Sequence, residues 1–272
     1  MARRARRSVA TPARPRTKRS ASTQDRASAQ GRAARTARAA PSAPSRPKAR
    51  IRPARPARVR PLAADTVLRL FAKLSRAIPE PKSELQHATP FELLVSVILS
   101  AQATDKSVNL ATARLFAVAR TPEAIVALGE AGLLGYIRTI GLAPTKAKNL
   151  IAASRLLLER HGGQVPSSRE ALEALPGVGR KTANVVLNTA FGQATLAVDT
   201  HVFRVANRTG LAPGKTVRAV EDGLLRVVPP AYLKSAHHLL ILHGRYTCKA
   251  RQPACPACPI RAECAWPEKS GP

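Results

Sequence analysis

The segment from Leu175 to Val186, Leu-Pro-Gly-Val-Gly-Arg-Lys-Thr-Ala-Asn-Val-Val, constrains the fold of this chain more than any other. Its proline and two glycines, Gly177 and Gly179, predict a tight hairpin, because glycine allows backbone conformations and close approaches that a Cβ hinders. A helix is predicted to follow directly, with Arg180 and Lys181 in its first turn. The free N–H groups of such a helix start bind anions, so the segment predicts a phosphate site that Lys181 faces.

A carboxylate follows in the segment Val-Asp-Thr-His that ends at His201. Asp199 is predicted to open another helix, where aspartate is a favoured N-cap. A solvated Lys181 and a capping Asp199 would each have an ordinary structural explanation. Together they predict a lysine and a carboxylate that converge on one substrate, whereas His201 is expected to be structural.

Composition defines the class of protein and its partner. The chain has 272 residues, of which 44% are hydrophobic, enough for one large core or two small ones. Its 45 Lys and Arg residues against 16 Asp and Glu give a net charge of +29, which points to a polyanionic partner, with nucleic acid first. It contains no apolar run long enough for a membrane helix and no secretory signal, so we expect a soluble, intracellular protein.

Much of the positive charge lies in residues 1–60, which hold 19 Lys and Arg and one acid, Asp25. This segment has seven prolines and no aromatic residue, so it buries too little apolar surface to offset the entropy of ordering. We predict a disordered basic tail. It could attract phosphates, act only as a solubilising leader, or be an organelle transit peptide, against which its prolines count.

From Pro61 onward, helical signals recur and strand alternation is absent. One apolar face at helical spacing comprises Val67, Leu68, Leu70, Phe71, Leu74 and Ile78. Predicted helix caps are Thr89 with Glu92, Thr104, Thr121, Ser167 with Glu170 and, at a helix end, Gly162. The globular part is therefore predicted to be all-α, with about ten short helices.

All the cysteines lie near the C-terminus, in the spacing C-x6-C-x2-C-x5-C formed by Cys248, Cys255, Cys258 and Cys264. Two disulfides would suit a secreted protein, which this chain does not resemble. Tetrahedral zinc is a serious alternative. A single contiguous loop with one C-x2-C pair slightly favours a [4Fe-4S] cluster, and a bound metal would fix Lys249 and Arg251 on a rigid surface suited to phosphate.

Together, the glycine hairpin, the Val-Asp-Thr-His segment and the cysteine spacing resemble the endonuclease III family of helix-hairpin-helix DNA glycosylases and abasic-site lyases. The resemblance extends from about Leu62 to Cys264 and includes the segments 100–105 and 243–248. It implies a six-helix barrel over residues 84–194, which holds the hairpin. A second lobe, which carries a [4Fe-4S] cluster, would combine residues 62–83 with 195–268.

The resemblance also implies roles for individual residues. Lys181 would be the nucleophile that forms a Schiff base with C1′ of the damaged nucleoside, and Asp199 its catalytic carboxylate. Gln102 would fill the space that the flipped nucleoside leaves, and Leu142 would be an intercalating wedge. After Leu142, the family often has an aromatic residue and asparagine, where this chain has Ala143-Pro144.

The implied function is base excision repair: removal of oxidised pyrimidines from duplex DNA and cleavage 3′ to the abasic site by β-elimination. The remaining DNA contacts would come from Gly177, Gly179, Arg180, Lys249 and Arg251. The alternatives are an adenine-mismatch glycosylase, which differs at the Lys181 position, and a noncatalytic helix-hairpin-helix module. We expect a monomer that acts on damaged or abasic duplex DNA in the cytoplasm, at the nucleoid.

Overall fold

The computed structural model describes residues 60–271, and the basic tail predicted over residues 1–60 lies outside this part except for Arg60. Helices account for all of its regular secondary structure, which confirms the all-α prediction for the described residues. The elements are α1 (Ala64–Ala77), α2 (Pro90–Ser100), α3 (Asp105–Phe116), α4 (Pro122–Ile137), α5 (Ala143–His161), α6 (Arg169–Glu173), α7 (Arg180–Phe191), α8 (Thr200–Thr209), α9 (Val217–Val227), the 3-10 helix η1 (Pro230–Tyr232) and α10 (Leu233–Tyr246).

Side-chain caps fix most of the helix starts where the sequence places them. Thr89 accepts a hydrogen bond from the Glu92 N–H, and Thr104 and Thr121 cap α3 and α4 in the same way. The cap of α6 is Ser168, one residue after the predicted Ser167, because its hydroxyl is the one that accepts from the Ala171 N–H. These bonds satisfy backbone donors that a helix start leaves unpaired.

Buried side chains form two hydrophobic clusters. The first cluster contains buried residues of α2 to α7, between Leu85 and Ala197. The second cluster joins Val67, Leu70, Phe71 and Leu74 of α1 to buried residues between Leu196 and Ile260. Leu68, which we predicted on the apolar face of α1, is instead 51% exposed because its position turns it away from the second cluster.

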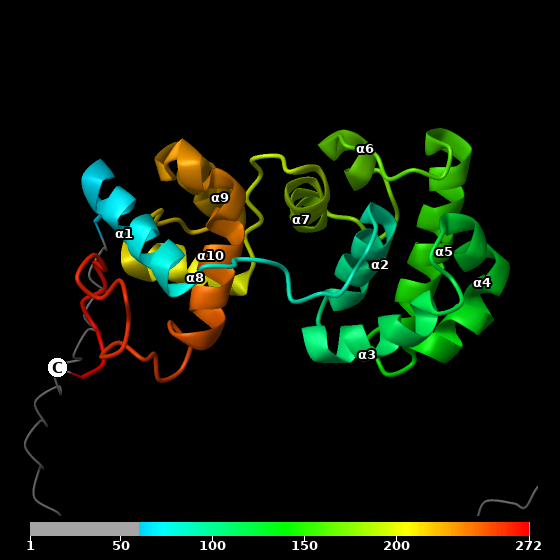
Figure 1. Cartoon of the computed structure of the whole chain (residues 1–272), viewed down its shortest axis with the longest axis horizontal. Helices are drawn as coiled ribbons and strands as arrows, with labels where there is room; N and C mark the ends of the chain where they lie inside the picture. Colours follow the sequence, from blue (N-terminus) through cyan, green and yellow to red (C-terminus); the bar gives the residue numbers. More distant parts are fainter. Residues whose placement is uncertain (1–59, 272) are drawn as a thin grey trace, which may run out of the picture. The chain divides into compact units, whose positions relative to one another are not determined.

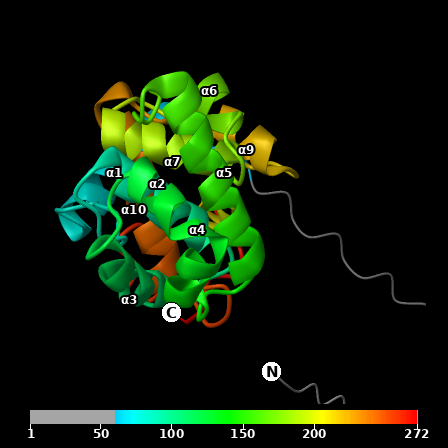
Figure 2. The same cartoon turned by 90° about the vertical axis from the view of Figure 1, so that its right-hand side faces the viewer.

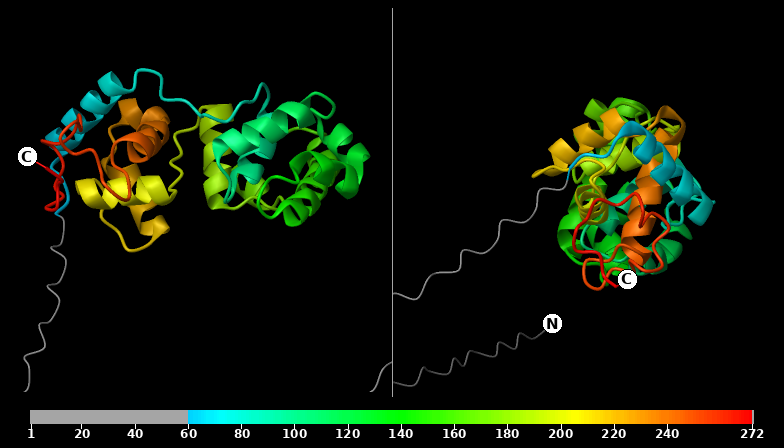
Figure 3. Two further views of the ribbon diagram at one scale, coloured as in Figure 1. Left: turned by 90° about the horizontal axis from the view of Figure 1, so that it is seen from below. Right: turned by 90° about the vertical axis from the view of Figure 1, so that its left-hand side faces the viewer.

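The helices group around these clusters (Figure 1). Figure 2 shows α4 and α5 in front, and these two helices pack along one another. Two stretches of chain join the groups, residues 78–89 and 192–199, as seen from below in Figure 3. The predicted domain limits at 83/84 and 194/195 fall on these stretches, and the division itself stays a prediction. No helix of the described part is long and apolar enough to span a bilayer.

Candidate active site

The glycine hairpin lies between α6 and α7, and its two glycines have different structural roles. Gly177 has φ +80°, the left-handed region, and a Cβ there would stand 3.1 Å from the side chain of Asn149. Gly179 is the N-cap of α7 with φ −103°, which any residue can adopt, and a Cβ there would meet nothing within 4 Å. Gly177 therefore shapes the hairpin, whereas Gly179 leaves open space in front of the helix start.

Lys181 is the second residue of α7, and its side chain lines a cavity of about 450 Å³. The side chain keeps access to solvent through this cavity, yet protein atoms surround the amine closely. This desolvation lowers the pKa of Lys181. Asp199 and Asp105 act in the opposite direction, and Arg245 adds to the lowering. The site thus favours the free amine more than water does.

Asp199 lines the same cavity and is the N-cap of α8, as predicted. Its Oδ1 accepts a hydrogen bond of 2.8 Å from the Val202 N–H. The capping bond fixes the side chain, so the carboxylate has a defined place in the wall that it shares with Lys181. The structure therefore brings the two predicted catalytic residues to one cavity.

Two histidines of α10 also line the cavity. Burial is the main cause that lowers the pKa of His237 to about 3 and that of His238 to about 4. Both rings are therefore neutral at neutral pH. His237 Nδ1 lies 2.9 Å from the Ala197 carbonyl oxygen, and only a protonated Nδ1 can bond there, which leaves Nε2 as an acceptor.

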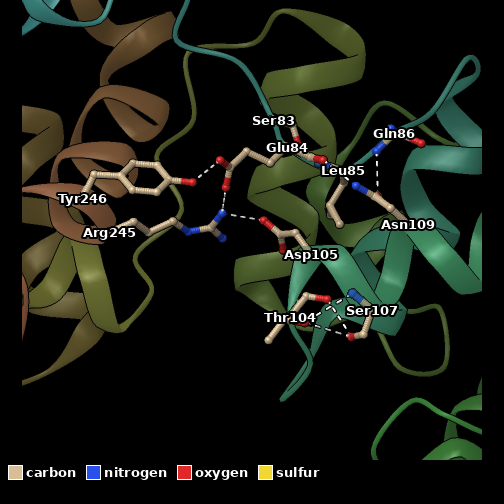
Figure 4. A network of polar contacts seen from close by, with 10 residues as sticks. All are labelled: Ser83, Glu84, Leu85, Gln86, Thr104, Asp105, Ser107, Asn109, Arg245 and Tyr246. Atoms are coloured by element: carbon tan, nitrogen blue, oxygen red, sulfur yellow. Dashed lines mark hydrogen bonds and ion pairs between the residues drawn. The ribbon is translucent and has the colours of Figure 1, made fainter.

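A polar network joins Glu84, Asp105 and Arg245, which all line the cavity (Figure 4). Arg245 of α10 forms ion pairs with Asp105, at the start of α3, and with Glu84, in the stretch between α1 and α2. The Tyr246 hydroxyl also donates to Glu84. The network ties α10, which belongs to the second cluster, to the first cluster beside Lys181. The sequence pattern around residues 243–248 predicted no role for Arg245, because its partners lie far away in the chain.

Gln102 lines the cavity with Lys181, whereas Leu142 lies outside its lining and is 58% exposed. Both residues have a left-handed backbone, with φ of 56° and 62°. Their turns are adjacent, because a Cβ on Gly141 would lie 3.5 Å from the Gln102 carbonyl oxygen. Pro144, where the family often differs, occupies the first turn of α5, a position that suits proline.

Lys146 connects the two turns. Its buried Nζ donates to the carbonyl oxygens of Leu99, at 2.8 Å, and Ala101, at 2.5 Å. These oxygens lie at the C-terminal end of α2, where a cation is favoured. Because Lys146 is in the first turn of α5, one side chain anchors both exposed turns.

All four cysteines are free thiols that line one largely apolar cavity. Within residues 60–271, no three Cys, His, Asp or Glu side chains are gathered closely enough to hold a single metal ion. Arg208 of α8 lies beside residues 248–264, the cysteine loop. It donates to the Lys249 and Ala250 carbonyls, its Nη1 is 3.7 Å from the Cys248 Sγ, and it stacks on Trp266.

The remaining predicted DNA contacts are placed differently. Lys249 and Arg251 are exposed on the cysteine loop. Arg180 is only partly exposed, and its guanidinium forms a bidentate pair with the buried Glu221 of α9. Sequence reasoning did not find Glu221, because nothing local distinguishes it from other acidic residues on amphipathic helices.

Residues 95–230 match the family model of the HhH-GPD superfamily base excision DNA repair proteins. Endonuclease III of Escherichia coli (strain K12) is 59% identical over 202 residues, which cover 74% of this chain and 96% of the relative. The chain belongs to the endonuclease III family. Endonuclease III of Treponema pallidum (strain Nichols) is 56% identical to this chain over 206 residues, which cover 76% of this chain and 98% of the relative.

Among solved structures, one of endonuclease III trapped as a covalent intermediate with DNA, an estranged-adenine complex, has a TM-score of 0.71 and 43% identity. It covers 75% of this chain and 96% of the solved one. Membership of this family makes the chain a base excision repair enzyme, and the predicted resemblance is confirmed.

Proposed function

We propose that this enzyme excises damaged bases from duplex DNA and cuts the abasic strand, with Lys181 as nucleophile and Asp199 as catalytic carboxylate. The observation that carries the proposal is that the two side chains line one cavity, where desolvation by the surrounding protein lowers the pKa of the lysine. The trapped covalent complex between a relative and DNA supports a covalent route.

The chemistry follows from a free amine beside a carboxylate. The Lys181 nitrogen attacks C1′ and forms a bond there, while the C1′–N bond to the base breaks and the base leaves with a proton. Asp199 stabilises the positive charge that develops at C1′ and carries a proton between the amine and the leaving oxygen or base. The C1′–O4′ bond then breaks as O4′ takes up a proton and the amine loses one, which leaves the lysine nitrogen doubly bonded to C1′ as an iminium. This iminium acidifies the C2′ proton, and its removal expels the 3′ phosphate by β-elimination.

Borohydride trapping tests this assignment, because it reduces the imine to a stable bond between protein and DNA. The parent protein should be trapped on abasic duplex DNA, and Lys181→Ala should not. Asp199→Asn should fold and bind DNA but lose most base excision. Trapping that persists in Lys181→Ala would show that this lysine is not the nucleophile. An Asp199→Asn variant whose only defect is a lower melting temperature would show that Asp199 acts only as a helix cap.

For the lesion, we propose oxidised pyrimidines. The resemblance to the family supports this choice, and the cavity beside Lys181 offers a neutral, hydrogen-bonding wall of the two histidines to a base taken out of the stack. The enzyme should excise the base faster from a duplex with thymine glycol than from one with an adenine mismatch. Faster release of the mismatched adenine would reverse the assignment.

We propose that the four cysteines hold a [4Fe-4S] cluster. They are free thiols around one cavity, and the Arg208 guanidinium beside Cys248 offsets the charge of thiolate ligands. When bound, such a cluster supplies a crosslink that orders the loop. Anaerobically prepared protein should contain about four irons per chain, and Cys258→Ala should lose them. Zinc in place of iron would establish the alternative.

We propose that duplex DNA is held by the hairpin backbone at Gly177 and Gly179 and by the exposed Lys249 and Arg251, with Gln102 and Leu142 at the flipped nucleoside. The exposure of Leu142 and the position of Gln102 on the cavity wall support these last two roles. A net charge of +29 would concentrate the protein on DNA, in the cytoplasm at the nucleoid.

We further propose that the protein is a monomer, which size-exclusion chromatography with light scattering would verify.

A further inference from the structure

A buried carboxylate lies behind the hairpin. The Glu221 side chain is 3% exposed. Its two oxygens accept from Arg180 Nε at 3.1 and 2.9 Å, and Oε1 also accepts from Arg180 Nη2 at 2.8 Å. Glu221 belongs to α9, whose buried residues contribute to the second cluster, whereas α7 contributes to the first. The pair therefore connects the two clusters.

Asn184 extends this connection. Its Nδ2 donates to Glu221 Oε1 at 3.1 Å and to the Leu196 carbonyl oxygen at 3.2 Å. The Thr195 hydroxyl donates to the Asn184 carbonyl oxygen at 2.7 Å. Helix α7 is thus bonded, through one buried residue, to both α9 and the segment that leads to Asp199.

The connection joins the two halves of the proposed catalytic pair. Lys181 follows Arg180 directly in α7, and Leu196 lies three residues before Asp199. We propose that Glu221, with Arg180 and Asn184, is a positioning residue that sets the distance between the Lys181 amine and the Asp199 carboxylate. This inference rests on the proposed function.

A buried ion pair is a poor source of stability, because desolvation of both charges offsets their attraction. Its directional bidentate geometry is instead suited to fixing one helix against another. Catalysis demands such fixation, since a small misplacement of reacting groups slows a reaction greatly.

Glu221→Gln tests the inference, since it keeps the shape and removes the charge. The matched control is Asp222→Asn, the next residue of α9, whose partner Arg218 is exposed. With enzyme in excess over abasic duplex DNA, the rate of borohydride-trapped product should fall about tenfold in Glu221→Gln, at a DNA dissociation constant within about twofold of the parent. Asp222→Asn should match the parent in both.

A double-mutant cycle separates positioning from general weakening. If Glu221 acts through the placement of Asp199, the loss of rate in Glu221→Gln combined with Asp199→Asn should be much smaller than the product of the single losses. Losses that multiply, or a defect confined to DNA affinity, would overturn the inference.

Should Glu221→Gln fail to fold, Arg180→Lys provides the same test from the partly exposed partner, because it keeps the charge and loses the bidentate geometry. A parent protein that is not trapped at all would refute the proposed function. A parent that is trapped, with Glu221→Gln or Arg180→Lys trapped at the same rate, would refute this inference alone.

Discussion

The amine of Lys181 lies among groups that act on its pKa in opposite directions. Desolvation has the largest effect and lowers it, Asp199 and Asp105 raise it, and Arg245 lowers it. The two cavity histidines stay neutral above pH 5 because their pKa values are about 3 and about 4. The pH dependence of the reaction should therefore report mainly on the lysine and its charged neighbours.

Asp105→Asn tests this balance. Without this carboxylate, the pKa of Lys181 falls further, so the free amine is present at lower pH. The rising limb of the rate of borohydride trapping against pH should move toward acid, whereas Asp65→Asn, whose carboxylate pairs with Arg69 on α1, should leave it in place. A shift toward alkaline pH would mean that Arg245, released from its ion pair with Asp105, moves away from the amine and no longer lowers its pKa.

The two hairpin glycines should respond differently to alanine. Gly177→Ala forces a side chain into a left-handed conformation and against Asn149, which should cost about 1 to 2 kcal/mol of folding free energy. Gly179→Ala has open space and an ordinary backbone, so its melting temperature should fall by only the small cost of alanine at an N-cap, less than that of Gly177→Ala. If a DNA phosphate approaches the backbone at Gly179, the affinity of Gly179→Ala for duplex DNA should fall. An unchanged affinity would mean that DNA binds elsewhere.

These residues also show what a sequence can reveal. Lys181, Asp199 and the caps at Thr89 and Thr104 follow from local patterns, since a helix start depends on its immediate neighbours. The partners of Arg245 and Glu221 could not be predicted, because they depend on how helices distant in sequence pack. For the same reason, the helical periodicity of α1 did not predict that Leu68 is exposed, because periodicity does not define the width of the buried face.

At the scale of elements, α5 and α2 are joined at the end where both carry an exposed turn. Lys146→Met would leave the carbonyls of Leu99 and Ala101 without their donor, which should lower the free energy of unfolding by about 1 to 3 kcal/mol. Lys148→Met, at an exposed position of the same helix, is the control. Chemical denaturation would compare them, and equal stabilities would show that water replaces the ammonium group at no cost.

Helix α8 is the other element with two functional ends. Asp199 caps its start, and near its end Arg208 holds the cysteine loop through the carbonyls of Lys249 and Ala250. Between them, Arg204 donates to the Gly244 and Cys248 carbonyls. The helix therefore links the wall of the cavity shared by Lys181 and Asp199 to the loop proposed to carry the cluster, a connection that the separate motifs did not reveal.

At the scale of the whole described molecule, the segment before Asp199 serves both hydrophobic clusters. Ala197 is buried in the first cluster, whereas its neighbours Leu196 and Val198 are buried in the second. Neither cluster can lose its packing without exposing side chains of this segment. The two hydrophobic clusters consequently share this segment of chain.

This sharing has a consequence for folding cooperativity. If one cluster cannot open alone, the slowest-exchanging amide hydrogens in α2 and in α10 should report a single opening free energy, although the helices belong to different clusters. Native-state hydrogen exchange read by mass spectrometry would measure both. Two separate opening energies would mean that the cavity lined by Lys181 and Asp199 can open while one hydrophobic cluster stays packed. A single opening energy would mean that this cavity persists for as long as the protein is folded.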